Sequence, residues 1–366
     1  MSRHLAWFFF AVVLLALSAP LQALNYEVGG CKTGSSYVNF TTISAAVVGV
    51  PAGATIQICP GVYPEQVTIT QPLTLKGIGF NNANRAVITI NPNGSLAPNV
   101  TSSINGLPFY AQVLVQNINP AGPVSIIGIT VDGSGDNAGC SAETLAGIFY
   151  ASGTSGTVNE VTARNQVNGG CGWGIWVVNG AASSQTITIA NSSVHNAGFD
   201  GGGIAASSVS PPTLSATVSG NCLSNAGFFG IDDSSTGVIA GNVLTSVAGP
   251  GIFAESDSLT VSANTVADIS GIGIETKGAN TVQSNKLSNV GDSIALFPDV
   301  AATVKSNIIK NTFCGIDFSG GSSSGTISGN TLNDSLYGFA NWLGPNIVGD
   351  SLYNINNVQS TSASCP

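Results

Sequence analysis

Two carboxylates stand at equivalent places in a repeated phrase, because Asp232 and Glu275 each directly follow a Gly-Ile pair. Asp233 comes next to the first carboxylate, and Lys277 stands two residues after the second. Carboxyl groups on either side of a glycosidic bond can act as general acid and general base in its hydrolysis. A lysine could instead take a proton from a sugar carbon, with a cation to stabilise the resulting anion. These four residues are therefore the candidate catalytic groups.

The segments that must position these residues form a repeat. An apolar residue, usually after Gly, recurs at Ile231, Ile252, Ile274, Ile294, Ile316 and Phe339. An Asn recurs in phase with it at Asn191, Asn221, Asn242, Asn264, Asn285, Asn307 and Asn330. From Asn221 onward the spacing is 21, 22, 21, 22 and 23 residues. A fixed period of this length predicts a solenoid of stacked coils, with the Asn column as a structural ladder inside it.

The coils can be placed in register, because neighbouring residues of a strand point to opposite faces. The residue one past each Gly-Ile position then points outward, in a column of Trp176, Ala205, Asp232, Phe253, Glu275, Ala295, Asp317 and Ala340. The next residue points inward, so Asp233 would need a partner inside the coil. Since coils stack about 4.8 Å apart, Asp232 and Glu275 would lie roughly 9–10 Å from each other, with Phe253 between them.

The same face would carry further polar and aromatic groups. Two positions beyond that column, Glu255 and Lys277 become direct neighbours. An aromatic ring beside carboxylates suits a sugar, whose apolar face packs on the ring while its hydroxyls bind the carboxylates. The expected substrate-binding residues are Trp176, Phe253, Glu255, Asp317 and, if its segment reaches this face, His195.

The opening module resembles known proteins. Residues 53–79, GATIQICPGVYPEQVTITQPLTLKGIG, resemble the first coil of right-handed parallel β-helix proteins of the pectin-lyase-like superfamily, especially its pectin-methylesterase-type opening. With the later repeat, the resemblance covers nearly all of residues 30–345. It implies an all-β fold, a right-handed parallel β-helix of roughly ten or more coils. A helix at residues 40–50, with Thr41 or Thr42 as its cap, would close the N-terminal end.

The N-terminus has the features of a signal peptide. Arg3 precedes an apolar run from Leu5 to Ser18 that is too short for an ordinary membrane-spanning helix, and a small-residue boundary follows at Ala23. We expect cleavage there, and no later segment could cross a bilayer as a helix. The predicted organisation is a signal peptide in 1–23, one β-helix domain in 24–345 (N-terminal cap and first coil in 30–80, regular coils in 145–345) and a C-terminal tail in 346–366.

Seven cysteines fit an oxidising compartment, so we expect a secreted, periplasmic or cell-surface protein. Their places in the repeat suggest the pairs Cys31–Cys59, Cys140–Cys171 and Cys314–Cys365, with Cys222 left over. No CxxC motif occurs, and His195 is the only histidine after the signal peptide, so we expect no transition-metal site.

Enzymatic activity stays open between two reactions. Residues 230–233 are similar to the double-Asp element of polygalacturonases, which implies an inverting hydrolase with Asp233 or His195 assisting, but their Asn-Thr-Asp, Gly-His-Gly and Arg-Ile-Lys motifs are absent. A lyase or epimerase acting on a pectin- or alginate-like uronan would use Lys277 as its base. Ca²⁺ held by Asp232, Glu255 and Glu275 would then stabilise the anion. The Arg-x-Pro-x-x-Arg and Asp-Pro-His motifs of such enzymes are absent too, as is the later Asp-Phe-Ile-Phe-Gly element of pectin methylesterases.

A third alternative is a surface protein or adhesin that binds glycan without cleaving it. The net charge of −9 excludes a basic nucleic-acid surface. Only 7% of the residues are charged, which suits neutral sugars or anionic ones bridged by a cation. We expect a polysaccharide or other glycan as partner, no membrane contact after signal removal, and a monomer.

Overall fold

The structure is a computed structural model, and it describes residues 25–32, 36–79, 85–92, 96–101, 106, 108–136, 144–167, 171–198, 200–208, 213–297, 300–318, 325–341, 347–348, 350–353, 355 and 357–359. The predicted signal peptide lies outside these residues. Within them, no helix combines the length and the apolar character that a membrane span requires.

Two long sheets run through the molecule. The first has 14 strands in the spatial order β2 (Tyr37–Phe40), β1 (Asn25–Val28), β3 (Thr55–Ile58), β6 (Leu73–Gly77), β10 (Val124–Ile127), β13 (Gly156–Asn159), β16 (Gln185–Ala190), β19 (Leu214–Ser219), β22 (Thr236–Ala240), β25 (Leu259–Ser262), β27 (Thr281–Gln283), β29 (Thr303–Lys305), β31 (Thr326–Ser328) and β33 (Ile347–Val348).

The second has 21 strands, namely β4 (Gly61–Pro64), β5 (Val67–Ile69), β7 (Ala86–Thr89), β8 (Val100–Thr101), β9 (Pro108–Val115), β11 (Ile129–Asp132), β12 (Thr144–Tyr150), β14 (Thr162–Gln166), β15 (Gly172–Asn179), β17 (Ser193–Ala197), β18 (Gly202–Ser208), β20 (Cys222–Ser224), β21 (Phe229–Asp233), β23 (Val243–Thr245), β24 (Ile252–Ala254), β26 (Thr265–Thr276), β28 (Lys286–Leu296), β30 (Ile308–Phe318), β32 (Thr331–Ala340), β34 (Ser351–Tyr353) and β35 (Asn357–Gln359).

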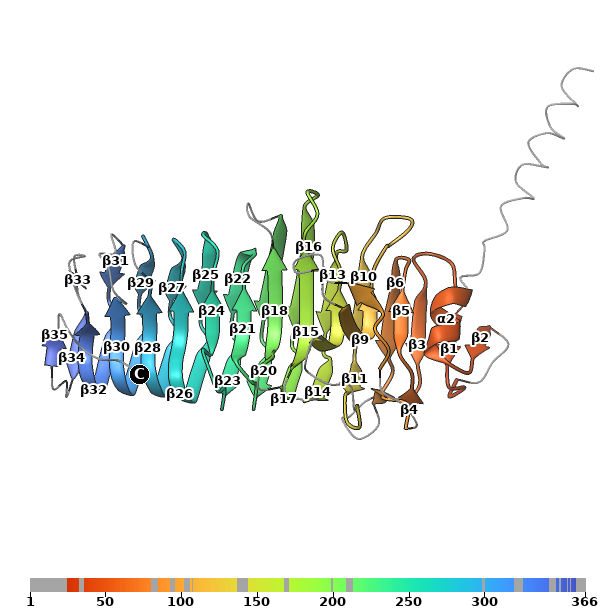
Figure 1. Ribbon diagram of the computed structural model, residues 1–366, viewed down its shortest axis with the longest axis horizontal. Coiled ribbons are helices and arrows are strands. Elements are labelled where there is room, and N and C mark those ends of the chain that lie inside the picture. The colour runs from red at the N-terminus through yellow and green to blue at the C-terminus, as the bar shows by residue number, and fades with distance from the viewer. Residues whose placement is uncertain are drawn as a thin grey trace, which may run out of the picture.

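The strands stack into one elongated solenoid (Figure 1). Each coil contributes a strand to the first sheet and one or more to the second, and each strand pairs in parallel with its counterpart in the next coil. The pair β8–β9 is antiparallel. The structure therefore confirms the predicted parallel β-helix.

Columns of branched apolar side chains fill the interior. In the first sheet, Val158, Ile189, Val218, Ile239, Val261, Val282 and Val304 face one another in successive strands. In the second sheet, Ile175, Ile204, Ile231, Ile252, Ile274, Ile294 and Ile316 do the same. All are buried in one continuous core, because β-branched side chains pack well on a pleated surface. The predicted inward position of the Gly-Ile residues is confirmed.

A ladder of buried Asn side chains runs beside this core. The backbone and side-chain N–H groups of Asn242 both donate to Oδ1 of Asn264, at 2.9 Å, and Asn264 donates in the same way to Asn285 at 2.9 and 3.0 Å. Each side chain also donates to a carbonyl of the first sheet, as Asn264 does to Ile239 at 3.0 Å. The predicted ladder is therefore present, and every amide in it has its polar atoms satisfied.

The prediction that Asn191 belongs to this ladder is wrong. Asn191 is exposed with φ 50°, and Ser192 takes the ladder position, donating its N–H to Oδ1 of Asn221 at 2.9 Å. In later coils a small residue such as Gly220 or Gly241 adopts the left-handed turn just before the Asn. Asn tolerates that conformation, so in this coil it occupies the turn and the ladder position falls one residue later.

The N-terminal end carries the helix α2 (Ile43–Gly49), shorter than the predicted 40–50. Thr42 is its N-cap, as expected, and its side chain accepts from the N–H of Ala45 at 3.1 Å. The Glu65 carboxylate accepts the N–H groups of Ile43 and Ser44, both at 2.8 Å. A carboxylate at this position pairs with N–H groups of the first turn that have no partner within the helix, and its negative charge interacts favourably with the positive end of the helix dipole. The buried residues of α2 pack into the main core. Strands β1 and β2 lie at the same end of the stack, so α2 does not cover this end alone (Figure 1).

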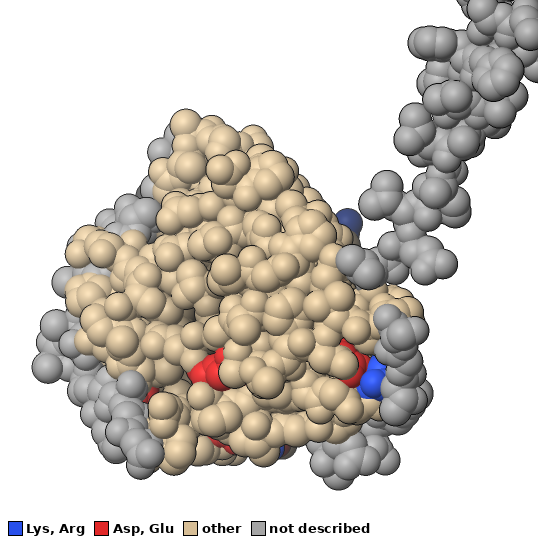
Figure 2. Space-filling view, turned by 90° about the vertical axis from the view of Figure 1, so that its right-hand side faces the viewer, with Lys and Arg blue, Asp and Glu red and all other residues tan. Residues whose placement is uncertain are grey.

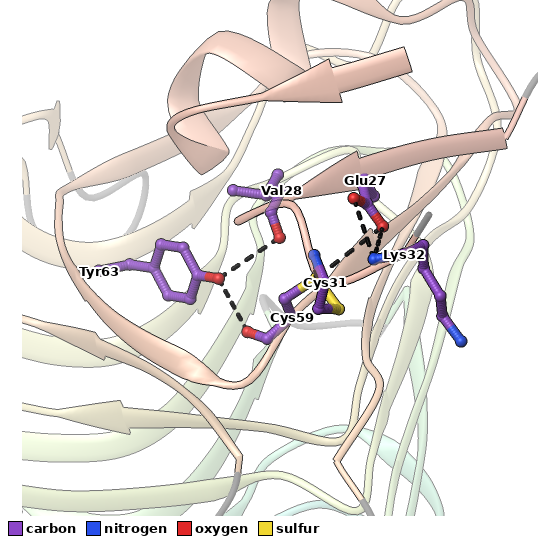
Figure 3. Close-up of a disulfide and its surroundings, with 6 residues drawn as sticks. All are labelled: Glu27, Val28, Cys31, Lys32, Cys59 and Tyr63. Carbon is purple, nitrogen blue, oxygen red and sulfur yellow. Dashed lines mark hydrogen bonds between the residues drawn. A yellow bond between two sulfur atoms is a disulfide. The ribbon is translucent and has the colours of Figure 1, made fainter. Parts of the chain in front are cut away.

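The turn of the opening module around Tyr63 has a structural role. Tyr63 donates its hydroxyl to the carbonyl of Cys59 at 2.8 Å, beside the disulfide Cys31–Cys59 and the buried Glu27 (Figure 3). The first predicted disulfide, Cys31–Cys59, is thus confirmed. Seen from the N-terminal end, the surface has few charged groups (Figure 2).

Cys171 and Cys314 are disulfide-bonded as well. Their predicted partners, Cys140 and Cys365, lie outside the described residues. Cys222 is a free, exposed thiol, as its lack of a predicted partner indicates.

The stack continues past residue 345, where the sequence predicts a tail. Strand β33 pairs with β31, and β34 and β35 pair with β32. Asp350 accepts the N–H of Asn330. An Asp therefore replaces Asn in this coil, which hides the repeat from a search for Asn.

Candidate functional site

The outward column is assembled in the predicted register. Asp232 on β21 faces Phe253 on β24, and Phe253 faces Glu275 on β26. Further along, Glu275 faces Ala295 and Ala295 faces Asp317 on β30. In the other direction, Asp232 faces Ala205, which faces Trp176 on β15. We call these residues, from Trp176 to Asp317, the outer stripe.

Asp232 is the most perturbed carboxyl of the outer stripe. Its Oδ1 is shielded from solvent and has no hydrogen-bond partner among the described residues. Burial, followed by repulsion from Glu255 and Asp233, raises the pKa of Asp232 to about 8, although Lys277 acts in the opposite direction. Asp232 is therefore a carboxylic acid at neutral pH, which is the protonation state that a general acid needs.

Asp233 lies inside the coil, as the alternation of the strand predicts. It is completely buried, and its Oδ1 accepts the backbone N–H of Ser235 at 2.8 Å. Burial raises the pKa of Asp233 to about 7, against the opposing effect of the hydrogen bonds from Ser235. Since the side chain faces the core, it cannot contact a substrate on the outer stripe, and the expected water-positioning role does not fit its place.

Glu275 stands two strands beyond Asp232 and is partly exposed. Burial raises the pKa of Glu275; Lys277 lowers it and Glu255 raises it. Two strand spacings place these residues about 9–10 Å apart along the solenoid. A carboxyl separation of this size leaves room for a water molecule beside a bound sugar.

Lys277 is held between an anion and two aromatic rings. Its Nζ lies 3.1 Å from Oε1 of Glu255, 4.3 Å from the ring centre of Phe253 and 5.0 Å from that of Phe297. These contacts fix the ammonium group in place through charge and through the negative face of each ring. The ammonium group is therefore already engaged by Glu255 and the two rings, which does not suit a general base.

Phe253 separates the two carboxyl groups but offers little free ring surface. It stacks on Phe229 with centroids 5.1 Å apart and planes 2° from parallel, and Lys277 lies over the ring as well. Only 6% of the residue is exposed. Phe253 therefore acts as a spacer between Asp232 and Glu275, and not as the expected open surface for a sugar.

Other predicted substrate-binding residues lie at the ends of the outer stripe. The indole N–H of Trp176 donates to Oγ of Ser207 at 3.0 Å, and its ring packs on Phe109 at 4.7 Å. Asp317 is buried and accepts the side-chain N–H of Asn341 at 2.7 Å. Both residues are on the predicted face, two coils outside the Asp232–Glu275 pair.

His195 is not brought to the outer stripe. It lies on β17, in a different column, between Arg164 and Ser224. Its Nδ1 is 2.7 Å from Oγ of Ser224, and burial and Arg164 lower its pKa. Its segment is a strand of the coil and not a loop that could reach across.

Sequence reasoning missed Asp292, which is almost wholly buried. Burial, repulsion from Asp317 and a hydrogen bond with Asp317 together raise the pKa of Asp292 well above the ordinary range of an aspartate. Its neighbours in the column are Ile272, Cys314 and Tyr337. A lone acid in an apolar column was the available signal.

Sequence reasoning also missed the aromatic residues Trp173, Phe228 and Phe229. Trp173 is nearly parallel to Phe229, with ring centres 6.4 Å apart, and Phe228 meets Phe229 edge to face at 4.6 Å. These rings extend the aromatic side of the outer stripe toward the N-terminus.

The carboxylates do not gather as the predicted calcium ligands. Among the described residues, the group of three possible ligand atoms within 4.8 Å is Glu27, Cys31 and Cys59, and its two cysteines form a disulfide. Asp232, Glu255 and Glu275 do not form such a group, and Glu255 is already paired with Lys277. Calcium needs six to eight oxygen ligands, so this arrangement does not fit it.

The fold is shared with known proteins. A family model described as a right handed beta helix region matches residues 216–352. A search of curated proteins gave no match.

Among solved structures, the A-module of the Azotobacter vinelandii mannuronan C-5 epimerase AlgE6 is similar at 17% identity and a TM-score of 0.59, over 88% of this chain and 95% of that one. The GH136 lacto-N-biosidase from Eubacterium ramulus is similar at 10% identity and a TM-score of 0.64, over 91% of this chain and 68% of that one. At such low identity these likenesses show the fold alone. The chain is thus a right-handed parallel β-helix protein, and these comparisons assign it to no single enzyme family.

Proposed function

We propose that the protein is an exported inverting glycoside hydrolase that acts on a neutral polysaccharide at the outer stripe. The observation that carries the proposal is the pairing of Asp232, whose pKa is raised to about 8, with Glu275 two strands away. One carboxyl group is protonated at neutral pH and the other is accessible to solvent. Inverting hydrolysis requires a protonated acid on one side of the bond and, on the other, a carboxylate that can reach a water molecule.

The roles follow from these states. Asp232 donates its proton to the glycosidic oxygen as the bond from that oxygen to the anomeric carbon breaks. The Glu275 carboxylate takes a proton from water, whose oxygen attacks the anomeric carbon from the opposite face. Asp232 ends as a carboxylate and Glu275 as an acid, and exchange of protons with solvent restores both.

The charges favour a neutral substrate over a uronan. Glu255, Glu275 and Asp317 stand on the described part of this face with a single cation, Lys277, and that cation is paired with Glu255. A uronate would meet repulsion, without a free cation to stabilise the anion of a lyase or epimerase reaction. An epimerase and a glycosidase have the same fold, which adds only that carbohydrate chemistry can occur on it. The disulfide Cys31–Cys59 supports export, because disulfides persist in oxidising compartments.

The test is product formation on a panel of soluble polysaccharides. Neutral polymers (xyloglucan, galactomannan, mixed-linkage glucan) and charged ones (polygalacturonate, alginate) are incubated with the protein, and new reducing ends and unsaturated uronate absorbance are followed. We expect reducing ends from a neutral polymer, with the anomer of the first product inverted by NMR. Asp232→Asn and Glu275→Gln should each lower kcat by at least about a hundredfold.

Asp268→Asn is the matched control. Asp268 is exposed in another column and accepts from Asn289, so an Asn there resembles its neighbour. Full activity in Asp232→Asn, or unsaturated product, would contradict the proposal. Binding without any product would favour the non-catalytic alternative.

A further inference from the structure

One aromatic side chain beside the catalytic pair has no assigned role. Phe228 immediately precedes β21, and 50% of its surface is exposed. Its backbone N–H donates to the carbonyl of Gly201 at 2.9 Å. Its ring meets Phe229 at 84° with centroids 4.6 Å apart. The ring is thus held from one side while half of the residue faces solvent.

Contacts between rings link Phe228 to the catalytic pair. Phe228 packs on Phe229, which stacks on Phe253, and Phe253 stands between Asp232 and Glu275. The position of Phe228 relative to the two carboxyl groups is therefore fixed by packed rings and not by a mobile side chain. Preorganised aromatic surfaces of this kind lose little entropy when a ligand packs on them.

The described residues that flank Phe228 in the two neighbouring coils are glycines, which carry no side chain over its ring. Gly201 and Gly249 flank it along the solenoid axis, and a Cβ on Gly249 would lie 2.1 Å from the carbonyl oxygen of Phe228. A side chain there would collide with the backbone, so that neighbour has to be glycine. The opposite holds for Phe253, whose ring is covered by Phe229 and Lys277.

We propose that Phe228 is the platform on which a neutral pyranose of the bound glycan stacks, next to the sugar that lies between Asp232 and Glu275. The C–H face of a pyranose packs on an aromatic ring as another apolar surface does, and the carboxylates of Glu255 and Glu275 on the same face disfavour a uronate. The glycan then runs from the Asp232–Glu275 pair along the strand direction, toward the start of β21. This inference rests on the proposed function for the position of the cleaved bond, but stacking itself requires no cleavage.

Binding can be measured without turnover in a background that carries Asp232→Asn and Glu275→Gln. Native gels that contain xyloglucan, galactomannan, mixed-linkage glucan or polygalacturonate report binding as retarded migration. We expect retardation by at least one neutral polymer. Phe228→Ala should weaken the apparent affinity at least tenfold, while Phe228→Trp should retain it within about threefold.

Phe313→Ala is the matched control, because Phe313 is an aromatic residue of similar exposure, 40%, and packs on Tyr337 four coils away. We expect it to bind like the parent. Equal retardation of Phe228→Ala and parent, or equal weakening by Phe313→Ala, would overturn the proposal. A second readout that does not require the Ala variant is the fluorescence of Phe228→Trp, which should change on addition of the retarding polymer relative to the parent, and an unchanged signal also overturns it.

The outcomes separate this inference from the proposed function. Retardation that is lost in Phe228→Ala, with no product from the wild-type protein, removes the hydrolase and keeps the platform. Product formation with an unaffected Phe228→Ala removes the platform and keeps the hydrolase. No retardation by any polymer in the panel overturns the platform.

Discussion

Lys277 forms its ion pair with Glu255, on the neighbouring coil, and the two side chains lie 3.1 Å apart beside Asp232. They act on Asp232 in opposite directions, because Glu255 raises its pKa and Lys277 lowers it. The same two residues act on Glu275 in the same directions. One partly exposed ion pair therefore adjusts both groups that the proposed reaction uses.

The pH dependence of activity should reflect both carboxyl groups. Since Asp232 must carry a proton and its pKa is about 8, kcat/KM should fall as pH rises through about 8. On the acid side, activity should be lost at a pH above the ordinary range of a glutamate, because burial raises the pKa of Glu275. A rate profile from pH 4 to 10 on the cleaved polymer checks this. An alkaline limit near pH 5 would contradict the assignment of Asp232 as the acid.

The ion pair provides a test with opposite signs. Glu255→Gln removes a negative charge that raises both pKa values, so both limbs of the profile should move to lower pH. Lys277→Met removes a positive charge that lowers both, so both limbs should move to higher pH. Shifts in the same direction for the two variants would show that the pair does not set these pKa values.

Asp233 should make the fold more stable in mild acid than at neutral pH. Its pKa is about 7 in the folded protein and 3.8 for a free side chain, so the folded state binds the extra proton between these values. Stability is then fully present below about pH 4 and is lost as pH rises toward 7. Asp233→Asn keeps an oxygen for Ser235 and cannot ionise. We expect it to flatten this part of the stability curve.

At pH 8, Asp233→Asn should have a free energy of unfolding higher than that of the wild type by on the order of 2–4 kcal/mol, since each pKa unit corresponds to about 1.4 kcal/mol. Urea midpoints of wild type and Asp233→Asn at pH 4 and pH 8 measure it. Equal differences at the two pH values would show that Asp233 does not contribute through ionisation.

The buried Asn ladder should matter more than the exposed Asn beside it. Asn264→Ala removes an Oδ1 that accepts two N–H groups from Asn242, which leaves buried donors without partners. We expect a loss of about 3 kcal/mol, seen as a lower urea midpoint. Asn191→Gly is the control, because Asn191 is exposed in a left-handed turn whose positive φ glycine adopts without steric strain. A similar loss in both variants would contradict the distinction.

Removal of divalent metal should leave activity unchanged. The carboxylates of the outer stripe do not converge on a common point within the described residues, and Glu255 is already neutralised by Lys277. Dialysis against a chelator, followed by the reducing-end assay with and without added Ca²⁺, tests this. A requirement for Ca²⁺ would instead support the uronan alternative.

The fold and the outer stripe were predictable because a solenoid converts sequence period into spatial register. The alternation within each strand placed Asp232 outward and Asp233 inward, and the structure has both as expected. Where the period carried the information, the prediction holds to the residue.

The rest depended on information that the period does not contain. Asn191 matches the repeated phrase, outside the regular spacing that begins at Asn221, but it occupies the turn instead of the ladder, since Asn suits both places. Phe253 lies where expected, but the ring contacts that close its faces depend on the neighbouring rotamers. Asp292 and Phe228 precede the Gly-Ile position, beyond the columns that the repeat singles out, so their part in the site emerges only from packing.

Phe253 as a spacer has a consequence for how such a site can change. Along the solenoid, the distance between side chains of one column is available only in steps of about 4.8 Å. A carboxylate at residue 253 in place of Glu275 would stand one step from Asp232, close to the 5–5.5 Å typical of retaining glycosidases. The separation of the two carboxyl groups, and with it the stereochemical outcome, can therefore change only in discrete steps of one coil. A substitution that moves a carboxylate by one coil would exchange inversion for retention without any movement of the backbone.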